Sequence, residues 1–440
     1  MQSENWLWGI QLIVFIPIAC ITTCLAVTYS RLSNLSKLLV CLCLCTISTF
    51  SYANGILAWV IVFPALAFYK ASSLRDLINK KWLILAGIVG LTINAVVYFY
   101  DYKKPEYHPS FSEALVHPFK AISYFLAFLG SPLGFGDLIA SHIAGAIIII
   151  VCLFVCFYSF KFRRSFNLRN CLLPWLVIGA YTIASALITT AGRVGFGVEQ
   201  SLSSRYTTFS IYLLVSLIYL VSIILDYLSS KDDINSSKLI VYRRVTVFLA
   251  TALVILHFLS FAHGVRMMTK AHRDRLQGKA CLLFMNVAQD EGCLTKRIFP
   301  SIEFLEVKVN PLNSLGFIKP GLVSSNLIED SINNSEINSD PNRGNFEEIR
   351  KNDDGQYTAY GTATQQTSKK PADAVILAYT DSSDNSIAFA ISKVKSNSSW
   401  KKSFSPEMIT LNSTTITAWA FDTTTGKLFK LNGTHLLQKP

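Results

Sequence analysis

The sequence predicts an all-α polytopic membrane bundle, with about eight spans plus one re-entrant or interfacial helix, followed by a small all-β, sandwich-like soluble domain. Of its 440 residues, 15% are charged and 51% are hydrophobic, whereas a soluble domain carries about 25% charged residues. The shortage of charge is confined to residues 1–262, where apolar runs recur. Each run is about 20 residues long, enough to cross a hydrocarbon core. From His263 onward the sequence is polar and mixed.

The apolar runs define the candidate spans. The run between residues 38 and 69 is divided into two because Tyr52-Ala53-Asn54-Gly55, in its middle, has the composition of a turn. A single tilted helix over 38–69 is the alternative. The candidate spans are residues 6–28, 38–51, 55–69, 82–100, 138–160, 171–191, 207–228 and 245–262.

The net charge of +12 is interpreted as an indicator of topology. The basic excess of residues 1–262 clusters in short loops, and cytoplasmic loops are enriched in Lys and Arg. A nucleic-acid partner is not expected, because no basic patch is interleaved with aromatic residues and no zinc or helix-turn-helix spacing is present. Four loops are expected to face the cytoplasm: residues 29–37, 70–81, 161–170 and 229–244.

The segment Pro118–Phe135 decides whether this topology is consistent. It is apolar enough to be a span, but counting it would place loops 70–81 and 161–170 on opposite sides. We therefore expect a re-entrant or interfacial helix on the outer face. Broken helices at membrane depth line cavities rather than face lipid, and the segment contains four helix-breaking residues: Pro118, Gly130, Pro132 and Gly134.

The outer face then holds the N-terminus, loops 101–137 and 192–206, and all of 263–440. The opening residues MQSEN lack the basic region of a secretory signal. An outward N-terminus without such a signal favours a chain that begins inside a longer protein, and the alternative is an inverted topology.

The polar part is divided at residue 355. Residues 263–354 are predicted to form a helix leaving the membrane and a loop-rich linker, with a mobile polar run at 333–343. Residues 355–440 are predicted to form an antiparallel β-domain, because short β-branched and aromatic runs alternate with turn residues. The expected strands are 374–381, 386–394, 415–422 and 427–431.

Cysteine usage also differs between the two parts. Cys281 and Cys293 are the only cysteines after residue 262, and they are expected to pair if that part faces an oxidising compartment. The others lie in or beside apolar runs, where cysteine behaves as a small hydrophobe. No metal site is expected.

Loop 192–206 carries the candidate binding residues. Arg193, Glu199 and Arg205 lie between two apolar runs, and charges at membrane depth usually face a bundle interior or a water-filled cavity. Because the arginine fork matches phosphate, we expect an anion site in which Glu199 orients one arginine. In the alternative, both arginines extend to lipid headgroups and Glu199 is solvated.

Loop 101–137 adds the candidate acid–base residues Asp101, His108 and Glu113, together with Glu106 and His117. A carboxylate or histidine near an anion site can act as a general base. The alternative is that each is an ordinary solvated loop residue.

Four stretches resemble a poorly characterised group of bacterial polytopic membrane proteins. They are GRVGFGVEQSLSSRYTTFS (Gly192–Ser210), ENWLWGIQ (Glu4–Gln11), SYANGILAW (Ser51–Trp59) and HPFKAISYFLAFLGSPLG (His117–Gly134). That group is distantly similar to the C-type glycosyltransferases. The resemblance implies a multi-pass protein of the bacterial inner membrane, with its C-terminal domain on the periplasmic side. It also implies a polyprenyl-phosphate-linked sugar donor at the outer face, with its phosphate bound by Arg193 and Arg205.

The resemblance has one departure. C-type glycosyltransferases carry a catalytic acidic residue in the outer loop after their first span, whereas this chain opens at ENWLWGIQ. The resemblance therefore implies that upstream spans and the catalytic carboxylate are missing. The stretches PADAVILAYTD (Pro371–Asp381) and ITAWAFD (Ile416–Asp422) are similar to a β-domain of envelope glycan assembly, which implies an envelope glycan as partner. The alternative function is a non-catalytic membrane anchor, transport or glycan-binding component.

Overall fold

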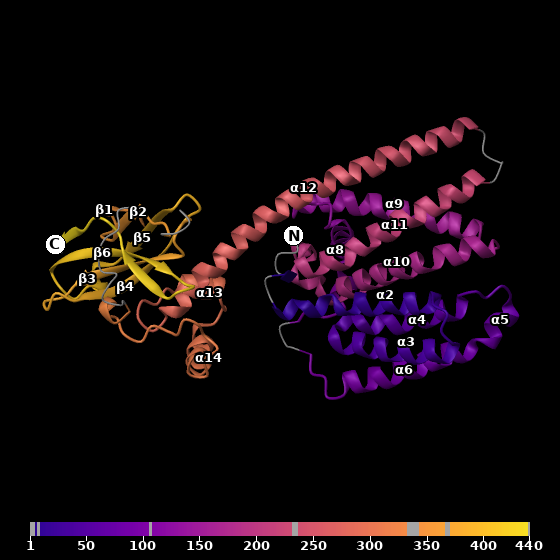
Figure 1. The fold of residues 1–440 in the computed structure, drawn as a ribbon, viewed down its shortest axis with the longest axis horizontal. Helices are drawn as coiled ribbons and strands as arrows, with labels where there is room; N and C mark the ends of the chain where they lie inside the picture. The colour runs from indigo at the N-terminus through magenta and orange to yellow at the C-terminus, as the bar shows by residue number, and fades with distance from the viewer. Residues whose placement is uncertain are drawn as a thin grey trace. The chain divides into compact units, whose positions relative to one another are not determined.

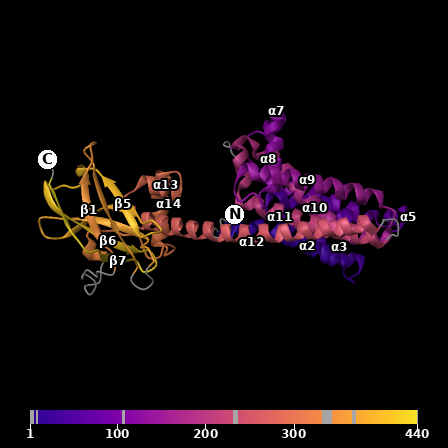
Figure 2. The same cartoon turned by 90° about the horizontal axis from the view of Figure 1, so that it is seen from above.

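The computed structural model describes residues 5–6, 9–104, 108–230, 236–331, 343–365 and 370–438. The chain divides into two compact units, Met1–Met268 and Thr269–Pro440. The first unit is a bundle of helices and the second joins short helices to β-sheets (Figures 1 and 2).

Within the described residues, seven helical segments are long and apolar enough to cross a membrane, which makes this a multi-pass membrane protein by length and composition. The expected total of about eight differs because the segment Ala53–Phe68 is shorter than the others. The seven are η1 (Gly9–Val14) with α2 (Ile16–Tyr29), α3 (Asn34–Ser51), α6 (Lys81–Phe99), α9 (Leu138–Lys161), α10 (Phe166–Arg193) with η3 (Val194–Phe196), α11 (Ser204–Ser230), and Ala250–Leu283 of α12 (Ser236–Leu283).

The turn inside residues 38–69 is confirmed. Extended backbone at Tyr52 ends α3, and the chain continues through η2 (Ala53–Ile56) into α4 (Leu57–Phe68). Ser48 of α3 donates a hydrogen bond to the Gly55 carbonyl at 3.0 Å, which closes the turn. A single tilted helix is therefore wrong.

Three of the four basic loops meet at one end of the bundle. The Tyr29 hydroxyl donates to the Asn170 carbonyl at 2.6 Å, the Lys70 amide donates to the Asn170 side chain at 3.1 Å, and Arg169 donates to the Ala71 carbonyl. The short helix α5 (Leu74–Asn79) lies at this end, opposite α8 (Figure 1). Loops 29–37, 70–81 and 161–170 therefore share one side; part of the fourth, 231–235, lies outside the described residues.

Helix α8 (Pro118–Gly130) follows the single turn of α7 (Glu113–Val116) and is too short to cross a membrane. At 1.5 Å per residue it is about 20 Å long, against a core of about 30 Å. Its second half is nevertheless mostly buried, with Tyr124, Ala127, Phe128 and Leu129 at 0% exposure, and it packs against α9, α10 and α11. This burial fits the re-entrant description better than a helix lying on the surface.

Two glycines allow α8 and α9 to touch through their backbones. A Cβ atom at Gly130 would overlap with the Ser141 carbonyl, and one at Gly145 would overlap with the Leu126 carbonyl. Small residues at such crossings let membrane helices approach closely.

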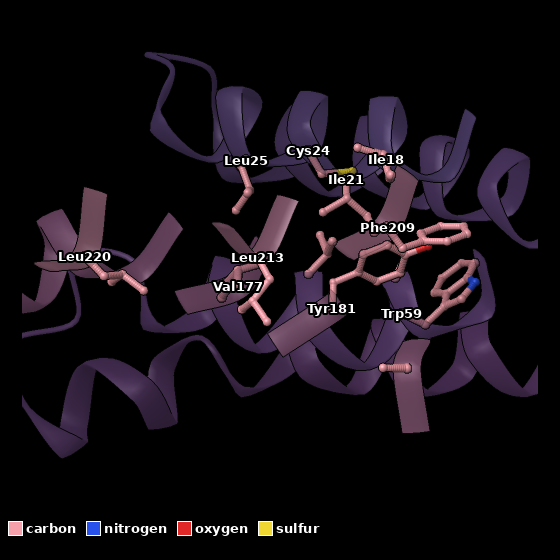
Figure 3. Close-up of a cluster of buried hydrophobic side chains, with 14 of the residues drawn as sticks. Ile18, Ile21, Cys24, Leu25, Trp59, Val177, Tyr181, Phe209, Leu213 and Leu220 are labelled. Carbon is pink, nitrogen blue, oxygen red and sulfur yellow. The ribbon is translucent and has the colours of Figure 1, made fainter. Parts of the chain in front are cut away.

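The bundle core lies between α2, α4, α10 and α11. Figure 3 shows Ile21, Trp59, Tyr181 and Phe209 from these four helices directed toward one another. Large apolar side chains on α6 and α9 are instead exposed, which is the surface that lipid would cover. They are Leu85, Ile88, Val89, Ile93, Val96, Val97, Ile139, Ile143, Ile147, Ile150, Leu153 and Phe157.

The second unit is layered, and its antiparallel β-structure is confirmed. A three-stranded sheet, β1-β2-β5, packs on a five-stranded sheet, β4-β3-β6-β7 with β8 beside β6. The outer face of the larger sheet packs against short helices. The strands are β1 (Phe346–Lys351), β2 (Tyr357–Thr362), β3 (Ala374–Thr380), β4 (Ser386–Lys393), β5 (Ser399–Phe404), β6 (Ser413–Asp422), β7 (Lys427–Lys430) and β8 (His435–Gln438).

The sequence found β3, β4, β6 and β7 but missed the other four strands. β1 begins at Phe346, ahead of the expected boundary at residue 355, and reads FEEIRK. Its charged residues and its partly exposed position hide the apolar alternation that marks a strand. Of the polar run 333–343, only Arg343 lies within the described residues.

Helix α12 continues past the apolar run to Leu283. It is followed by α13 (Glu291–Arg297) and by α14 (Ile302–Ser314), which lies in the stretch expected to be loop-rich. A disulfide joins Cys281 to Cys293, as the sequence predicted.

We predict that Gly145→Ala destabilises the bundle by about 1–3 kcal/mol, because the added methyl group forces α8 and α9 apart. Thermal unfolding in detergent measures this effect. Gly264→Ala is the matched control: it is also a helical glycine, but a Cβ atom there meets nothing within 4 Å, so its stability should stay unchanged or rise slightly. Equal melting temperatures for the two variants would contradict the close contact.

Candidate functional site

The connection between α10 and α11 consists of two short 3-10 helices, η3 and η4 (Val198–Leu202). Gly197 joins them with a φ of +100°, a conformation that side chains rarely adopt. This turn leaves Arg193 as the last residue of α10 and Arg205 in the first turn of α11.

Both guanidinium groups are partly buried, and the described residues place no carboxylate within ion-pair distance of either. The helix dipole favours Arg193 at the C-terminus of α10 but opposes Arg205 at the N-terminus of α11. The Nε atom of Arg205 is also buried, and none of the described residues offers it a hydrogen-bond partner. An unpaired buried donor costs about 1–3 kcal/mol of folding stability. The contacts of the described residues therefore do not explain why Arg205 is partly buried.

Tyrosine hydroxyl groups lie beside the two arginines. Burial and the neighbouring Tyr206 raise the pKa of Tyr52 to about 12, and the charges of Arg205 and Arg193 act in the opposite direction. The Tyr124 hydroxyl donates to Gln200 at 3.4 Å, and the Arg205 guanidinium lies 5.3 Å from the centre of the Tyr206 ring. Neutral donors around two cations are a suitable environment for an anion.

Loops 101–137 and 192–206 meet, which the sequence alone did not establish. A Cβ atom at Gly195 would overlap with Pro109, and one at Gly192 would lie 3.4 Å from Phe111. Arg193 Nη1 donates to His108 Nε2 at 3.3 Å. Burial first, and then the charges of Arg193 and Lys104, lower the pKa of His108.

A pocket of about 150 Å³ opens where these loops meet. Glu113 and His117 form one wall, with 3.7 Å between the carboxylate and the imidazole Nε2. The pocket thus combines an acid–base pair, a lysine and glycine backbone. Its lining residues are Glu113, His117, Lys120, Val194, Gly195, Gly197 and Val198.

The other residues that the sequence predicted do not line this pocket. Glu199 is exposed on η4 and makes no ion pair with either arginine among the described residues, so the structure does not give it the orienting role expected. Asp101 lies in an exposed turn after α6, with a φ of +55°. Glu106 lies outside the described residues. Two polar residues near the start of α9 have structural contacts: the Asp137 side chain accepts a hydrogen bond from the Ala140 amide, and His142 hydrogen-bonds to Ser123 of α8.

Sequence reasoning missed Tyr52, Tyr124, Gln200, Tyr206 and Lys120. Each lies within one of the stretches that carry the family resemblance, which was the available signal. The described residues contain no group of three side chains that could hold a metal ion.

Comparison of the chain with protein-family models, with curated proteins and with solved structures finds no match.

We predict that Arg193→Gln raises the pKa of His108, because it removes a positive charge 3.3 Å from the imidazole. The pH profile of His108 carbethoxylation, followed by mass spectrometry, reports this pKa, since only the neutral imidazole reacts. The midpoint should move to higher pH in Arg193→Gln and stay in place in Arg205→Gln. A midpoint that moves equally in both variants, or in neither, would show that the contact with Arg193 does not set the pKa.

Proposed function

We propose that this protein binds the phosphate of a lipid-linked sugar at the end of the bundle that carries Arg193 and Arg205. The observation that carries the proposal is the pair of partly buried guanidinium groups without a carboxylate partner in the described residues. Two planar donor forks match the oxygens of a phosphate or diphosphate.

The surroundings favour a lipid-linked ligand over a free one. The arginines lie at the ends of two apolar helices, α10 and α11, and the apolar side chains of Leu187 and Ile188 near the Arg193 end are exposed, so that a polyprenyl chain attached to the phosphate would have apolar surface beside it. The pocket beside Arg193 would then receive the sugar or its acceptor, with the backbone of Gly195 and Gly197 allowing close approach.

The proposed reaction is transfer of the sugar to an acceptor hydroxyl, as in the C-type glycosyltransferases. The acceptor oxygen bonds to C1 of the sugar while the C1–O bond to phosphate breaks, and the phosphate leaves with the electron pair. Arg193 and Arg205 stabilise the leaving phosphate. The acceptor proton passes to Glu113, which His117 orients from 3.7 Å away.

A non-catalytic binding component is the second candidate. It is favoured by the exposure of the candidate base. Among the described residues Glu113 is the single carboxylate that lines the pocket, and its side chain is 42% exposed. A transferase usually shields its base from water.

We propose that this end of the bundle faces outward in a bacterial inner membrane. The basic loops gather at the opposite end, as expected of a cytoplasmic side. The Cys281–Cys293 disulfide supports an oxidising compartment for the second unit.

We predict that Arg205→Ala weakens binding of farnesyl phosphate to the detergent-solubilised full chain by about 10–100-fold, because hydrogen bonds to charged groups contribute about 1.5–3 kcal/mol. Isothermal titration measures the affinity. Arg205→Lys should recover part of it, since lysine keeps the charge but not the fork. Arg163→Ala, an exposed arginine at the opposite end, is the matched control and should bind normally.

Normal affinity in a folded Arg205→Ala variant would overturn the phosphate site. Glu113→Gln separates the two candidates: a transferase loses sugar transfer but keeps farnesyl phosphate binding, whereas a binding component has no transfer to lose.

Orientation is tested by single cysteines at exposed positions, Glu199→Cys at one end and Arg163→Cys at the other. The eight free cysteines are replaced and the disulfide is kept. We predict that a membrane-impermeant maleimide labels position 199 in intact cells and position 163 only after permeabilisation. The reverse pattern would invert the topology and remove the outer-face ligand.

A further inference from the structure

Four basic side chains gather around Tyr69, the residue directly after α4. The ammonium groups of Lys37 and Lys70 lie 5.1 and 5.3 Å from the centre of the Tyr69 ring. Lys80 Nζ donates to the Tyr69 carbonyl at 2.5 Å, and Arg169 donates to the backbone carbonyl two residues further on. The four come from three separate loops of the sequence. We call Lys37, Lys70, Lys80 and Arg169 the basic cluster.

The backbone of Lys70 is strained. Its φ is +54°, a left-handed conformation that residues other than glycine seldom adopt. The Asn170 side chain accepts a hydrogen bond from the Lys70 amide at 3.1 Å, and the Asn170 carbonyl accepts one from Tyr29 at 2.6 Å. Backbone strain that surrounding contacts maintain is concentrated at functional and ligand-binding sites. The conformation of Lys70 therefore indicates that this end of the bundle has a role beyond packing.

Two members of the basic cluster are covered by the protein. Lys37 is 5% exposed, and its Nζ donates to the Thr28 carbonyl at 2.7 Å. The charges of Lys70 and Lys80 both act on it. The Nε atom of Arg169 is buried, and none of the described residues offers it a hydrogen-bond partner. Covered charges of one sign are costly unless a counter-charge lies close by.

The carboxylates at this end of the bundle supply only part of that counter-charge. Asp76 accepts hydrogen bonds from the amide and the hydroxyl of Ser72, at 2.8 and 2.7 Å, and from the next amide at 3.0 Å. Burial lowers the pKa of Lys80, and the charge of Asp76 opposes this effect. Among the described residues, neither Asp76 nor Asp226 near the end of α11 forms an ion pair with the basic cluster. An anion from outside the chain would therefore be stabilised here.

Exposed aromatic side chains border the basic cluster. Phe68 at the end of α4, Trp82 at the start of α6 and Phe166 at the start of α10 are all exposed. The Arg169 guanidinium lies 5.7 Å from the centre of the Phe166 ring. Aromatic residues at the ends of apolar helices are typical of the membrane interface. An anion bound here would thus lie at the level of the lipid headgroups.

We infer that the basic cluster binds the phosphate group of an anionic phospholipid. Lys70, which is exposed, and Lys80, which is partly exposed, donate to the phosphate oxygens. The two covered cations hold the anion from the protein side, and the acyl chains lie against the exposed aromatic side chains. Basic pockets between membrane helices are known to bind anionic headgroups. This site lies at the other end of the bundle from the proposed phosphate site and does not depend on it.

The test measures phospholipid binding to the full chain in detergent by native mass spectrometry. The unaltered chain should bind phosphatidylglycerol more tightly than phosphatidylcholine, whose choline group offsets the phosphate charge. Lys70→Gln/Lys80→Gln should weaken phosphatidylglycerol binding about 10-fold, because basic residues at an anionic surface each add to the affinity. The matched control, Arg75→Gln/Arg163→Gln, removes the same number of charges from exposed residues outside the basic cluster and should bind normally.

Lys37→Met tests the covered charge. The variant should keep the circular dichroism spectrum of the unaltered chain but lose the rise in melting temperature that phosphatidylglycerol produces. If the variant does not fold, the binding result for Lys70→Gln/Lys80→Gln decides alone.

Equal weakening in Lys70→Gln/Lys80→Gln and in the control would overturn the proposal, because the general basicity of this end would then explain the binding. Equal affinity of the unaltered chain for the two phospholipids would also overturn it. A rise in melting temperature with inorganic phosphate as large as that with phosphatidylglycerol would reject the lipid as ligand in favour of a soluble phosphate.

Discussion

The candidate site depends on the backbone contact between α8 and α9. Without side chains at Gly130 and Gly145, a helix too short to cross the membrane can bury its second half against longer ones. That burial brings Tyr124 to the arginines, and the chain leading into α8 brings Glu113 and His117 to the same place. The site is therefore assembled by close packing between helices rather than by its polar groups.

The sequence predicted those parts of the fold in which an apolar run is compatible with one kind of structure only. Long apolar runs have no stable place except a membrane or a core, so the helices of the bundle were found and only the short α4 altered the expected number. β3 was found because both of its faces are buried and it is apolar throughout. β1 and β5 have one exposed face and carry charged residues, so their alternation was obscured.

The sequence indicated the candidate site where charged residues stand between apolar runs. Arg193 and Arg205 stood out because charges between two apolar runs need a reason. Tyr52 and Tyr124 did not, because tyrosine is ordinary in an apolar segment and their proximity depends on how four helices pack. Glu199 makes no ion pair with either arginine among the described residues, since the turn at Gly197 begins a separate 3-10 helix in which Glu199 is exposed.

Arg193 and Arg205, which have no carboxylate partner in the described part of the chain, have a practical consequence for identifying the ligand. In the folded protein both charges act on the hydroxyl groups of Tyr52 and Tyr124, so an anion held there would meet both arginines only while the fold is intact. Any such compound therefore stabilises the folded state in proportion to its affinity and concentration. The melting temperature of the purified protein thus becomes a reporter that ranks unknown anions without any assumption about the reaction.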